Sequence, residues 1–168
     1  MIKLIVLDVD GTLTDGKLYI SNNGDEMKAF NVKDGLGITQ AISLEKEVAI
    51  ITGKTSLLVE KRSKELGIKE IHQGIKDKVG VLNNILEKYN IDYSNVAYMG
   101  DDLIDLAVMK KCKLTGCPKD SVDEILNISN FISTKNGGDG AVREFIEYIL
   151  KSENLWEQII NNFSPTNQ

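Results

Sequence analysis

The fold of this 168-residue chain is decided by the stretch KLIVLDVDGTLT at residues 3–14. Its first part, residues 3–7, is short, largely apolar and rich in β-branched side chains, which is typical of a buried parallel strand. Asp8 and a Gly11-Thr12 turn end this run. Similar runs recur along the chain, so we predict buried strands at residues 3–7, 48–51 and 96–99.

Apolar residues between these strands recur every three or four positions, which is the spacing of amphipathic helices. We expect helices at residues 36–44, 57–66, 79–89 and 103–109. Because strands and helices alternate, the predicted fold class is α/β, a doubly wound parallel sheet with helices on both faces. Ligands bind such sheets at the carboxyl ends of the strands. The short intervals between Asp10, Thr52 and Lys78 leave no room for an inserted cap domain.

We interpret residues 1–168 as a single domain, because this length suits one hydrophobic core better than two. Residues 17–30 predict a small β-hairpin flap, with a turn at residues 21–24 between apolar runs at 18–20 and 27–30. Residues 139–163 predict a C-terminal helical segment with a break near residues 152–154. We expect residues 164–168 to be frayed.

Charge and cysteine content argue against several classes of protein. The net charge of −5 disfavours nucleic acids and anionic membranes, which require a concentrated positive surface. Cys112 and Cys117 lack the spacing of redox or zinc motifs, which fits a reducing cytoplasm. We identify neither a secretion signal nor an apolar run close to the ~20 residues that span a bilayer. We therefore expect a cytoplasmic protein that binds neither nucleic acid nor membrane.

Two acidic groups follow predicted strands. Alternation along the first strand predicts that Asp8 and Asp10 lie on the same side, with Val9 pointing away. The second group, GDDLID at residues 100–105, comes after the strand at 96–99. Neighbouring carboxylates repel one another unless a cation neutralises them, and Mg²⁺ prefers oxygen ligands. We predict a Mg²⁺ site where the two groups meet, although either group alone could serve to end a strand or cap a helix.

Thr52, Gly53 and Lys78 are suited to binding a phosphate. Thr52 and Gly53 follow the strand at 48–51, where a hydroxyl and backbone N–H groups at a helix start can bind a tetrahedral anion. Lys78 begins the helix near residue 79 and can add a positive charge. Alone, Lys78 would be interpreted as a solvated surface lysine. Together with the acidic groups, these residues predict chemistry on a phosphate.

The chain resembles the haloacid dehalogenase-like phosphatases, whose four motifs match, in order, residues 8–14, Thr52, Lys78, and Gly100-Asp101-Asp102 with Asp105. The stretches AFNVKDGLGI at 29–38 and GGDGAVRE at 137–144 look like the sugar-acid branch of this superfamily. That branch includes the 3-deoxy-D-manno-octulosonate 8-phosphate phosphatases and the related nonulosonate 9-phosphate phosphatases. The resemblance thus covers nearly the whole chain.

The resemblance implies a covalent mechanism. Asp8 is expected to be the nucleophile that forms an aspartyl-phosphate, and Asp10 the acid and base of the two half-reactions. Thr52 and Lys78 are expected to hold the phosphoryl oxygens.

The resemblance also implies a set of metal ligands. Mg²⁺ would be bound by the Asp8 carboxylate, the Asp10 carbonyl and Asp101. Asp102 and Asp105 are expected to surround the metal site or Lys78 without binding the metal themselves.

Substrate contacts are expected around the helix at 57–66. Arg62 shares a largely apolar face with Val59 and Leu66, where an anionic ligand would explain a charge. The resemblance adds further substrate-binding candidates, namely Thr12, Lys33, Asp34, Gly53 and Lys54.

The substrate is expected to be 3-deoxy-D-manno-octulosonate 8-phosphate, as the stretch at 31–38 suggests. Lys54 departs from the octulosonate enzymes, which typically carry arginine there, and the stretch TGCP at 115–118 looks more like the nonulosonate enzymes. A sialic acid or KDN 9-phosphate is therefore the alternative. Members of this branch form homotetramers in which hairpins pack together. We therefore expect a homotetramer in which residues 137–143 reach an adjoining active site.

Two functions of other classes compete with this interpretation. A phospho-accepting signalling receiver also combines acids, a Thr and a Lys, but its acceptor follows a later strand than Asp8 does. A catalytically silent assembly domain, such as those fused to sugar-acid cytidylyltransferases, has no need for so many adjacent carboxylates.

Overall fold

The computed structural model describes residues 1–164, so the expectation for residues 164–168 lies almost wholly outside the described residues. A six-stranded parallel sheet, in the order β5-β4-β1-β6-β7-β8, forms its centre. The strands are β1 Leu4–Leu7, β4 Glu47–Ile51, β5 Glu70–His72, β6 Val96–Met99, β7 Leu114–Cys117 and β8 Phe131–Ile132. The predicted strands β1, β4 and β6 are confirmed. The sequence pattern does not predict β7 and β8, which lie at one side of the sheet.

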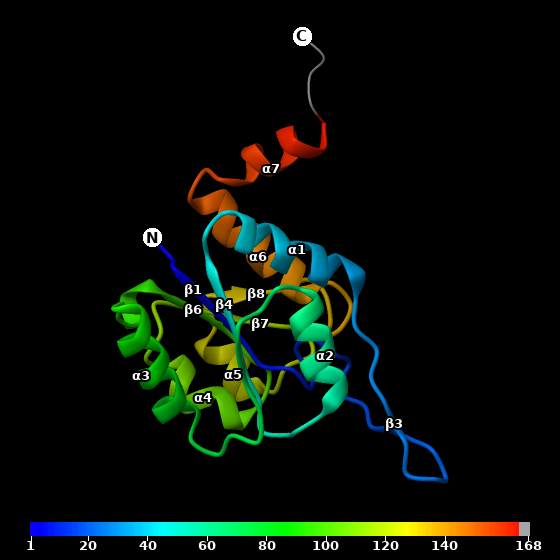
Figure 1. Cartoon of the computed structure of the whole chain (residues 1–168). Helices are drawn as coiled ribbons and strands as arrows, with labels where there is room; N and C mark the ends of the chain where they lie inside the picture. The colour runs from blue at the N-terminus through cyan, green and yellow to red at the C-terminus, as the bar shows by residue number, and fades with distance from the viewer. Residues whose placement is uncertain (165–168) are drawn as a thin grey trace.

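Helices cover both faces of this sheet (Figure 1). They are α1 Val32–Ser43, α2 Leu57–Glu65, α3 Lys78–Tyr89, α4 Leu103–Met109, α5 Asp123–Ile128, α6 Ala141–Ser152 and α7 Trp156–Phe163. One core lies between the sheet and α1, α2, α6 and α7, and the other lies between the sheet and α3, α4 and α5. The doubly wound α/β prediction is therefore confirmed, as is the break in the C-terminal helical segment. Among residues 1–164, no helix has the length and apolar character needed to cross a membrane.

Strand β1 is buried on both sides, which explains its continuous apolar sequence. Ile5 and Leu7 face the core under α1 and α6, while Leu4 and Val6 face the core under α3 and α4. All four side chains are inaccessible to solvent. The same alternation brings Asp8, the next residue, to the side of α3 and α4.

The predicted flap is present as a short antiparallel hairpin. Strand β2, Tyr19–Ile20, pairs with β3, Glu26–Met27, so that Tyr19 lies opposite Met27. Figure 1 shows the hairpin projecting from the sheet and helices that form the body of the molecule. Its apolar side chains Leu18, Ile20 and Met27 are exposed. The hairpin therefore offers an apolar surface that its own chain does not cover.

Gly137 and Gly138 pack against the loop after β1 of their own chain, and the expected contact of residues 137–143 with an adjoining active site stays a prediction. The Gly138 N–H donates to the carbonyl of Thr12 at 3.2 Å. A Cβ on Gly137 would lie 1.9 Å from the Gly11 carbonyl oxygen, so only glycine fits there. This glycine-rich segment therefore supports the loop that follows β1.

The C-terminal helical segment should contribute to stability through α6 much more than through the outer face of α7. Ile149 is fully buried, and its replacement by alanine should lower the free energy of unfolding by about 2–5 kcal/mol. Ile160 is 43% exposed, so Ile160→Ala should cost about 1 kcal/mol or less. Urea denaturation of both variants measures the difference, and equal losses would contradict this account of the core.

Candidate active site

The candidate site lies at the carboxyl ends of β1, β4 and β6. Asp8 directly follows β1, Thr52 directly follows β4, and Asp101 follows β6 after one glycine. Strand β1 lies between the other two, and its residue Leu7 pairs with Met99 of β6. The two acidic groups therefore meet at one edge of the sheet, as predicted.

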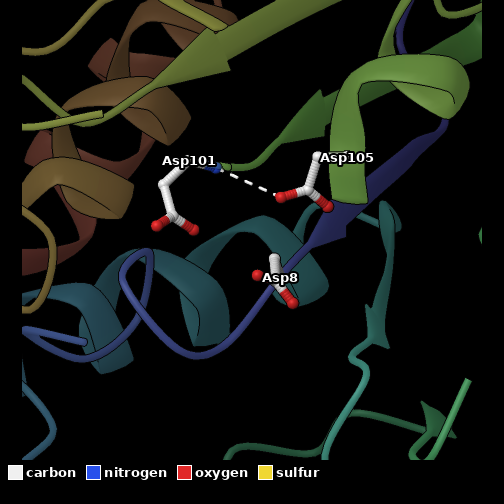
Figure 2. Close-up of side chains that lie close together, drawn as sticks. All are labelled: Asp8, Asp101 and Asp105. Carbon is white, nitrogen blue, oxygen red and sulfur yellow. Dashed lines mark hydrogen bonds between the residues drawn. The ribbon is translucent and has the colours of Figure 1, made fainter. Parts of the chain in front are cut away.

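Asp8, Asp101 and Asp105 form an acidic cluster at this edge (Figure 2). One carboxylate oxygen from each residue lies within 4.8 Å of the others. The three residues come from the end of β1, the loop after β6 and helix α4. Such an all-oxygen donor set is the kind that Mg²⁺ prefers, so these residues fit the predicted metal.

The proximity of the three carboxylates changes their protonation. Burial, together with the negative charge of Asp105, raises the pKa of Asp8 to about 6 despite the nearby Lys78. Burial and the charges of Asp8 and Asp105 raise the pKa of Asp101 to about 8. A divalent cation would relieve this repulsion, because it binds the deprotonated carboxylates.

Lys78 supplies a positive charge to the same point, as predicted. It is the first residue of α3, and its Nζ lies 3.0 Å from Asp8 Oδ1 and 2.7 Å from Asp105 Oδ1. Its side chain is only 4% exposed. Burial alone would lower the pKa of Lys78, but the two carboxylates hold it above its ordinary value. The interpretation as a solvated surface lysine is therefore wrong.

Asp105 is fully buried and is held by several donors. Its Oδ1 accepts from Lys78 and from the Tyr98 hydroxyl, at 2.7 and 2.8 Å, and its Oδ2 accepts from the Asp101 N–H at 3.2 Å. These bonds fix Asp105 beside the other two carboxylates. Asp102, by contrast, is exposed and accepts from the Leu103 N–H as the N-cap of α4. The structure thus gives Asp102 the capping role that the sequence left open.

The Asp10 side chain does not belong to the metal-sized acidic cluster within residues 1–164. Strand β1 has ended before this position, and the backbone N–H groups of residues 12–14 turn back to the Val9 carbonyl. Val9 packs in the core under α1 and α6, as predicted, while the placement of the Asp10 carbonyl at the metal stays a prediction. The Asp10 side chain forms an ion pair with Lys28 of the flap, at 2.7 Å.

Thr12 and Gly11 join the loops that follow β1 and β6. The Thr12 hydroxyl donates to Asp101 Oδ1 at 3.1 Å, and Thr12 is fully buried. Gly11 has a φ of +89°, and a Cβ there would lie 2.0 Å from Asp101 Oδ2. Glycine thus allows Asp101 to approach Asp8 closely. The structure shows Thr12 orienting an acid, whereas the sequence analysis predicts a substrate contact.

The residues expected to bind phosphate lie in the loops beside the acidic cluster. Thr52 is 2% exposed, and its backbone is tied to the β5 side by hydrogen bonds with His72 and Ile75. Gly53 and Lys54 are exposed in the loop before α2. Their contacts with substrate remain predictions.

Arg62 and Asp34 line a small pocket between α1 and α2, together with apolar side chains. Arg62 is partly exposed, so a contact with an anionic substrate remains a prediction. Asp34 is 1% exposed and accepts from the Arg143 N–H at 2.8 Å, at the start of α6. This burial does not support the predicted substrate contact of Asp34. Lys33 is exposed at the start of α1, and its substrate contact remains a prediction.

Sequence reasoning missed the functional context of Tyr98, Thr12 and Lys28. Tyr98 reads as an ordinary apolar strand residue, yet its hydroxyl orients Asp105. Lys28 reads as one of several hairpin charges, yet it contacts Asp10. For Lys28, the sequence shows only that it lies on the arm of the predicted flap that returns toward the body of the protein, which does not identify its partner.

The site combines an Asp-x-Asp motif after the first strand, a buried lysine and a second acidic loop, all on a doubly wound sheet. This combination defines a phosphoryl-transfer site of the haloacid dehalogenase type. Residues 62–146 match the family model described as haloacid dehalogenase-like hydrolase. The chain is 45% identical over 152 residues to the 3-deoxy-D-manno-octulosonate 8-phosphate phosphatase of Escherichia coli K12, covering 90% of this chain and 81% of that protein. The chain therefore belongs to the 3-deoxy-D-manno-octulosonate 8-phosphate phosphatase family of haloacid dehalogenase-like hydrolases.

Solved structures agree with this assignment. The Moraxella catarrhalis phosphatase of that name, in complex with magnesium ion, phosphate ion and KDO, superposes with a TM-score of 0.94. It is 42% identical, and the match covers 96% of this chain and 93% of that chain. A cobalt-bound phosphatase from Haemophilus influenzae is 33% identical with a TM-score of 0.87, covering 91% and 90% of the two chains.

Stabilisation by Mg²⁺ should grow as pH rises. In the metal-free protein, Asp8 and Asp101 have pKa values of about 6 and about 8, above their ordinary 3.8. Their contribution to stability is therefore present below about pH 4 and is lost as pH rises through the raised values. A fixed Mg²⁺ concentration of about 100 times the dissociation constant at about pH 8 should add about 2.7 kcal/mol there. The same concentration should add less at about pH 5, where protonation of the acids weakens metal binding. Thermal unfolding with and without Mg²⁺ measures the gain.

Asp101→Asn is the control for this prediction. The metal-free variant should be more stable than the metal-free wild type at about pH 8, because one of the repelling charges is gone. It should also lose most of the gain on adding Mg²⁺. An equal gain in the variant and the wild type would contradict a role for Asp101 in binding the ion.

Proposed function

We propose that this protein is a Mg²⁺-dependent phosphatase that hydrolyses 3-deoxy-D-manno-octulosonate 8-phosphate through an aspartyl-phosphate. The observation that carries this proposal is the convergence of Asp8, Asp101 and Lys78 at one sheet edge. The three-carboxylate cluster suits a divalent cation, and the buried lysine suits an anionic phosphoryl group. The identity to phosphatases of this name supports the substrate.

In the proposed reaction, an Asp8 oxygen attacks phosphorus while the bond to the sugar oxygen breaks. Asp10 gives its proton to that oxygen, and later accepts a proton from the water that attacks the aspartyl-phosphate. Lys78 and Thr52 bind phosphoryl oxygens, Asp105 holds Lys78, and Asp102 caps the helix that carries Asp105. When bound by the Asp8 and Asp101 carboxylates and the Asp10 carbonyl, Mg²⁺ supplies charge neutralisation between nucleophile and phosphate.

The main alternative is a nonulosonate 9-phosphate, such as that of sialic acid or KDN. The residues that suggest it, Lys54 and the stretch at 115–118, differ in exposure: Lys54 is exposed beside the site, while Thr115 and Cys117 are buried in β7. Only Lys54 can therefore meet a sugar directly. The receiver-like and silent-domain alternatives are disfavoured by identity to phosphatases along 90% of the chain.

A panel of sugar phosphates tests the proposed function. With Mg²⁺, phosphate release should be selectively fast for 3-deoxy-D-manno-octulosonate 8-phosphate, and it should stop when EDTA removes the metal. Asp8→Asn should lower kcat by on the order of 10⁴-fold or more, because it removes the nucleophile. A faster rate on a nonulosonate 9-phosphate would favour that compound as the substrate. Substantial turnover by Asp8→Asn would exclude the covalent route.

We further propose that residues 1–168 form one domain that assembles as a homotetramer in the cytoplasm, where it serves lipopolysaccharide synthesis. The exposed apolar side chains of the hairpin support the assembly, because monomers rarely leave such side chains grouped on one projection. The unpaired Cys112 and Cys117 support a reducing compartment.

Charges on the hairpin should break the proposed tetramer. Ile20 and Met27 are 64% and 67% exposed, so Ile20→Asp with Met27→Asp should leave the fold intact but give smaller species in light scattering after size exclusion. Ile132, 49% exposed on β8, provides the control, since Ile132→Asp should leave the mass unchanged. A wild-type protein that elutes as a monomer would exclude the tetramer.

A further inference from the structure

Lys28 connects the exposed flap to the candidate site. It lies just after β3, on the arm that returns to α1. Its side chain is only 3% exposed, although the hairpin around it is mostly exposed. Its Nζ lies 2.7 Å from Asp10 Oδ1 and 3.0 Å from Glu26 Oε1. Lysines are rarely covered so completely unless they are paired, so Lys28 has a specific structural task.

The Asp10 side chain depends on this lysine for its orientation. It is 25% exposed and lies outside the cluster that holds Asp8. In the part of the chain that the structure describes, Lys28 is the side chain that hydrogen-bonds to the Asp10 carboxylate. This bond is made to Oδ1, so rotation of the carboxylate is restrained while Oδ2 can face another partner. Proton transfer needs such restraint, because donor and acceptor must come within about 2.6–3.2 Å.

The position of Lys28 is fixed by the hairpin itself. The Tyr19 hydroxyl donates to Asp15 Oδ2 at 2.6 Å, and the Lys17 N–H donates to Asp15 Oδ1 at 2.9 Å. These bonds attach the outgoing arm to the loop that carries Asp10. Because Tyr19 pairs with Met27, the register of the hairpin then places the next residue, Lys28, beside that loop.

We propose that Lys28 is a positioning residue that holds Asp10 by one carboxylate oxygen so that the other faces the reacting oxygen atoms. The inference rests on the proposed function. In the first half-reaction, the bond from phosphorus to the sugar oxygen breaks, and that oxygen takes the proton of Asp10. In the second, water attacks phosphorus and gives a proton to Asp10 as the bond from Asp8 to phosphorus breaks. Lys28 keeps its own protons throughout.

Kinetics with two kinds of leaving group test this role. A sugar alkoxide needs a proton to depart, whereas p-nitrophenolate departs readily without one. Lys28→Met should therefore lower kcat for the sugar-acid phosphate about 10- to 100-fold with little change in KM. This loss is smaller than the full rate enhancement by general acid–base catalysis, which is roughly 10²–10⁴-fold. Its kcat/KM on p-nitrophenyl phosphate should fall less than about threefold, because this ratio reports only the steps up to formation of the aspartyl-phosphate. Lys28→Arg should recover much of the sugar-phosphate rate, because it keeps the charged hydrogen bond.

Two further variants complete the design. Lys17→Met removes an exposed lysine from the same hairpin and should match the wild type on both substrates. If Lys28 acts through Asp10, adding Lys28→Met to Asp10→Asn should cost less than about threefold, since the two effects are not additive.

The contrary outcomes are distinct. Equal losses of kcat/KM on both substrates, or a full additional loss in the double variant, would show that Lys28 only stabilises the flap and would overturn the inference. A raised KM with unchanged kcat would make it a substrate contact and would also overturn it. A wild-type enzyme inactive on every phosphate ester would instead remove the proposed function.

Discussion

The neighbouring positions of β1 and β6 force acidic side chains into one small volume. Strand pairing places Leu7 beside Met99, so the residues that follow the two strands also lie close together. With carboxylate oxygens within 4.8 Å, charge repulsion favours protonated acids over ionised ones. Lys78 compensates only partly, since the pKa values of Asp8 and Asp101 remain raised. The site therefore has a built-in affinity for a divalent cation.

Much of the surrounding structure can be understood as support for this unfavourable arrangement. Gly11 leaves space for the Asp101 carboxylate, and Gly100 does the same for Asp105, because a Cβ there would lie 2.4 Å from the Asp105 carboxyl carbon. Tyr98 and Thr12 then orient the acids through their hydroxyls. The glycine-rich segment before α6 packs behind the same loop. A site with repelling charges needs such rigid support, because any slack would let the carboxylates separate.

The sequence predicts the parts of this structure that depend on short-range patterns. The apolar runs of β1, β4 and β6 are buried on both sides, so their composition is unmistakable, and the acids after them follow from chain position. Strand β7 has the sequence LTGC, in which Thr and Gly interrupt the apolar run, and β8 has only two residues, so neither shows a clear pattern. The contact of Asp10 with Lys28 could not be predicted, because it depends on where the hairpin folds back. Nor could the burial of Asp34, which depends on how α6 packs against α1.

The flap resolves a difficulty that a parallel sheet without a cap domain creates. Its strands bring Asp8, Asp101 and Lys78 to one edge, but no strand reaches as far as Asp10. Asp10 shows the consequence, since it lies on a turn and has no strand neighbour to fix it. A hairpin that follows the loop after Asp8 and returns to α1 can supply a side chain there, and it uses few residues to do so. Its outer apolar surface can meanwhile pack against other copies of the chain. Assembly would then make the hairpin that orients Asp10 more rigid. In this way the proposed oligomer would affect the geometry of the site through the hairpin.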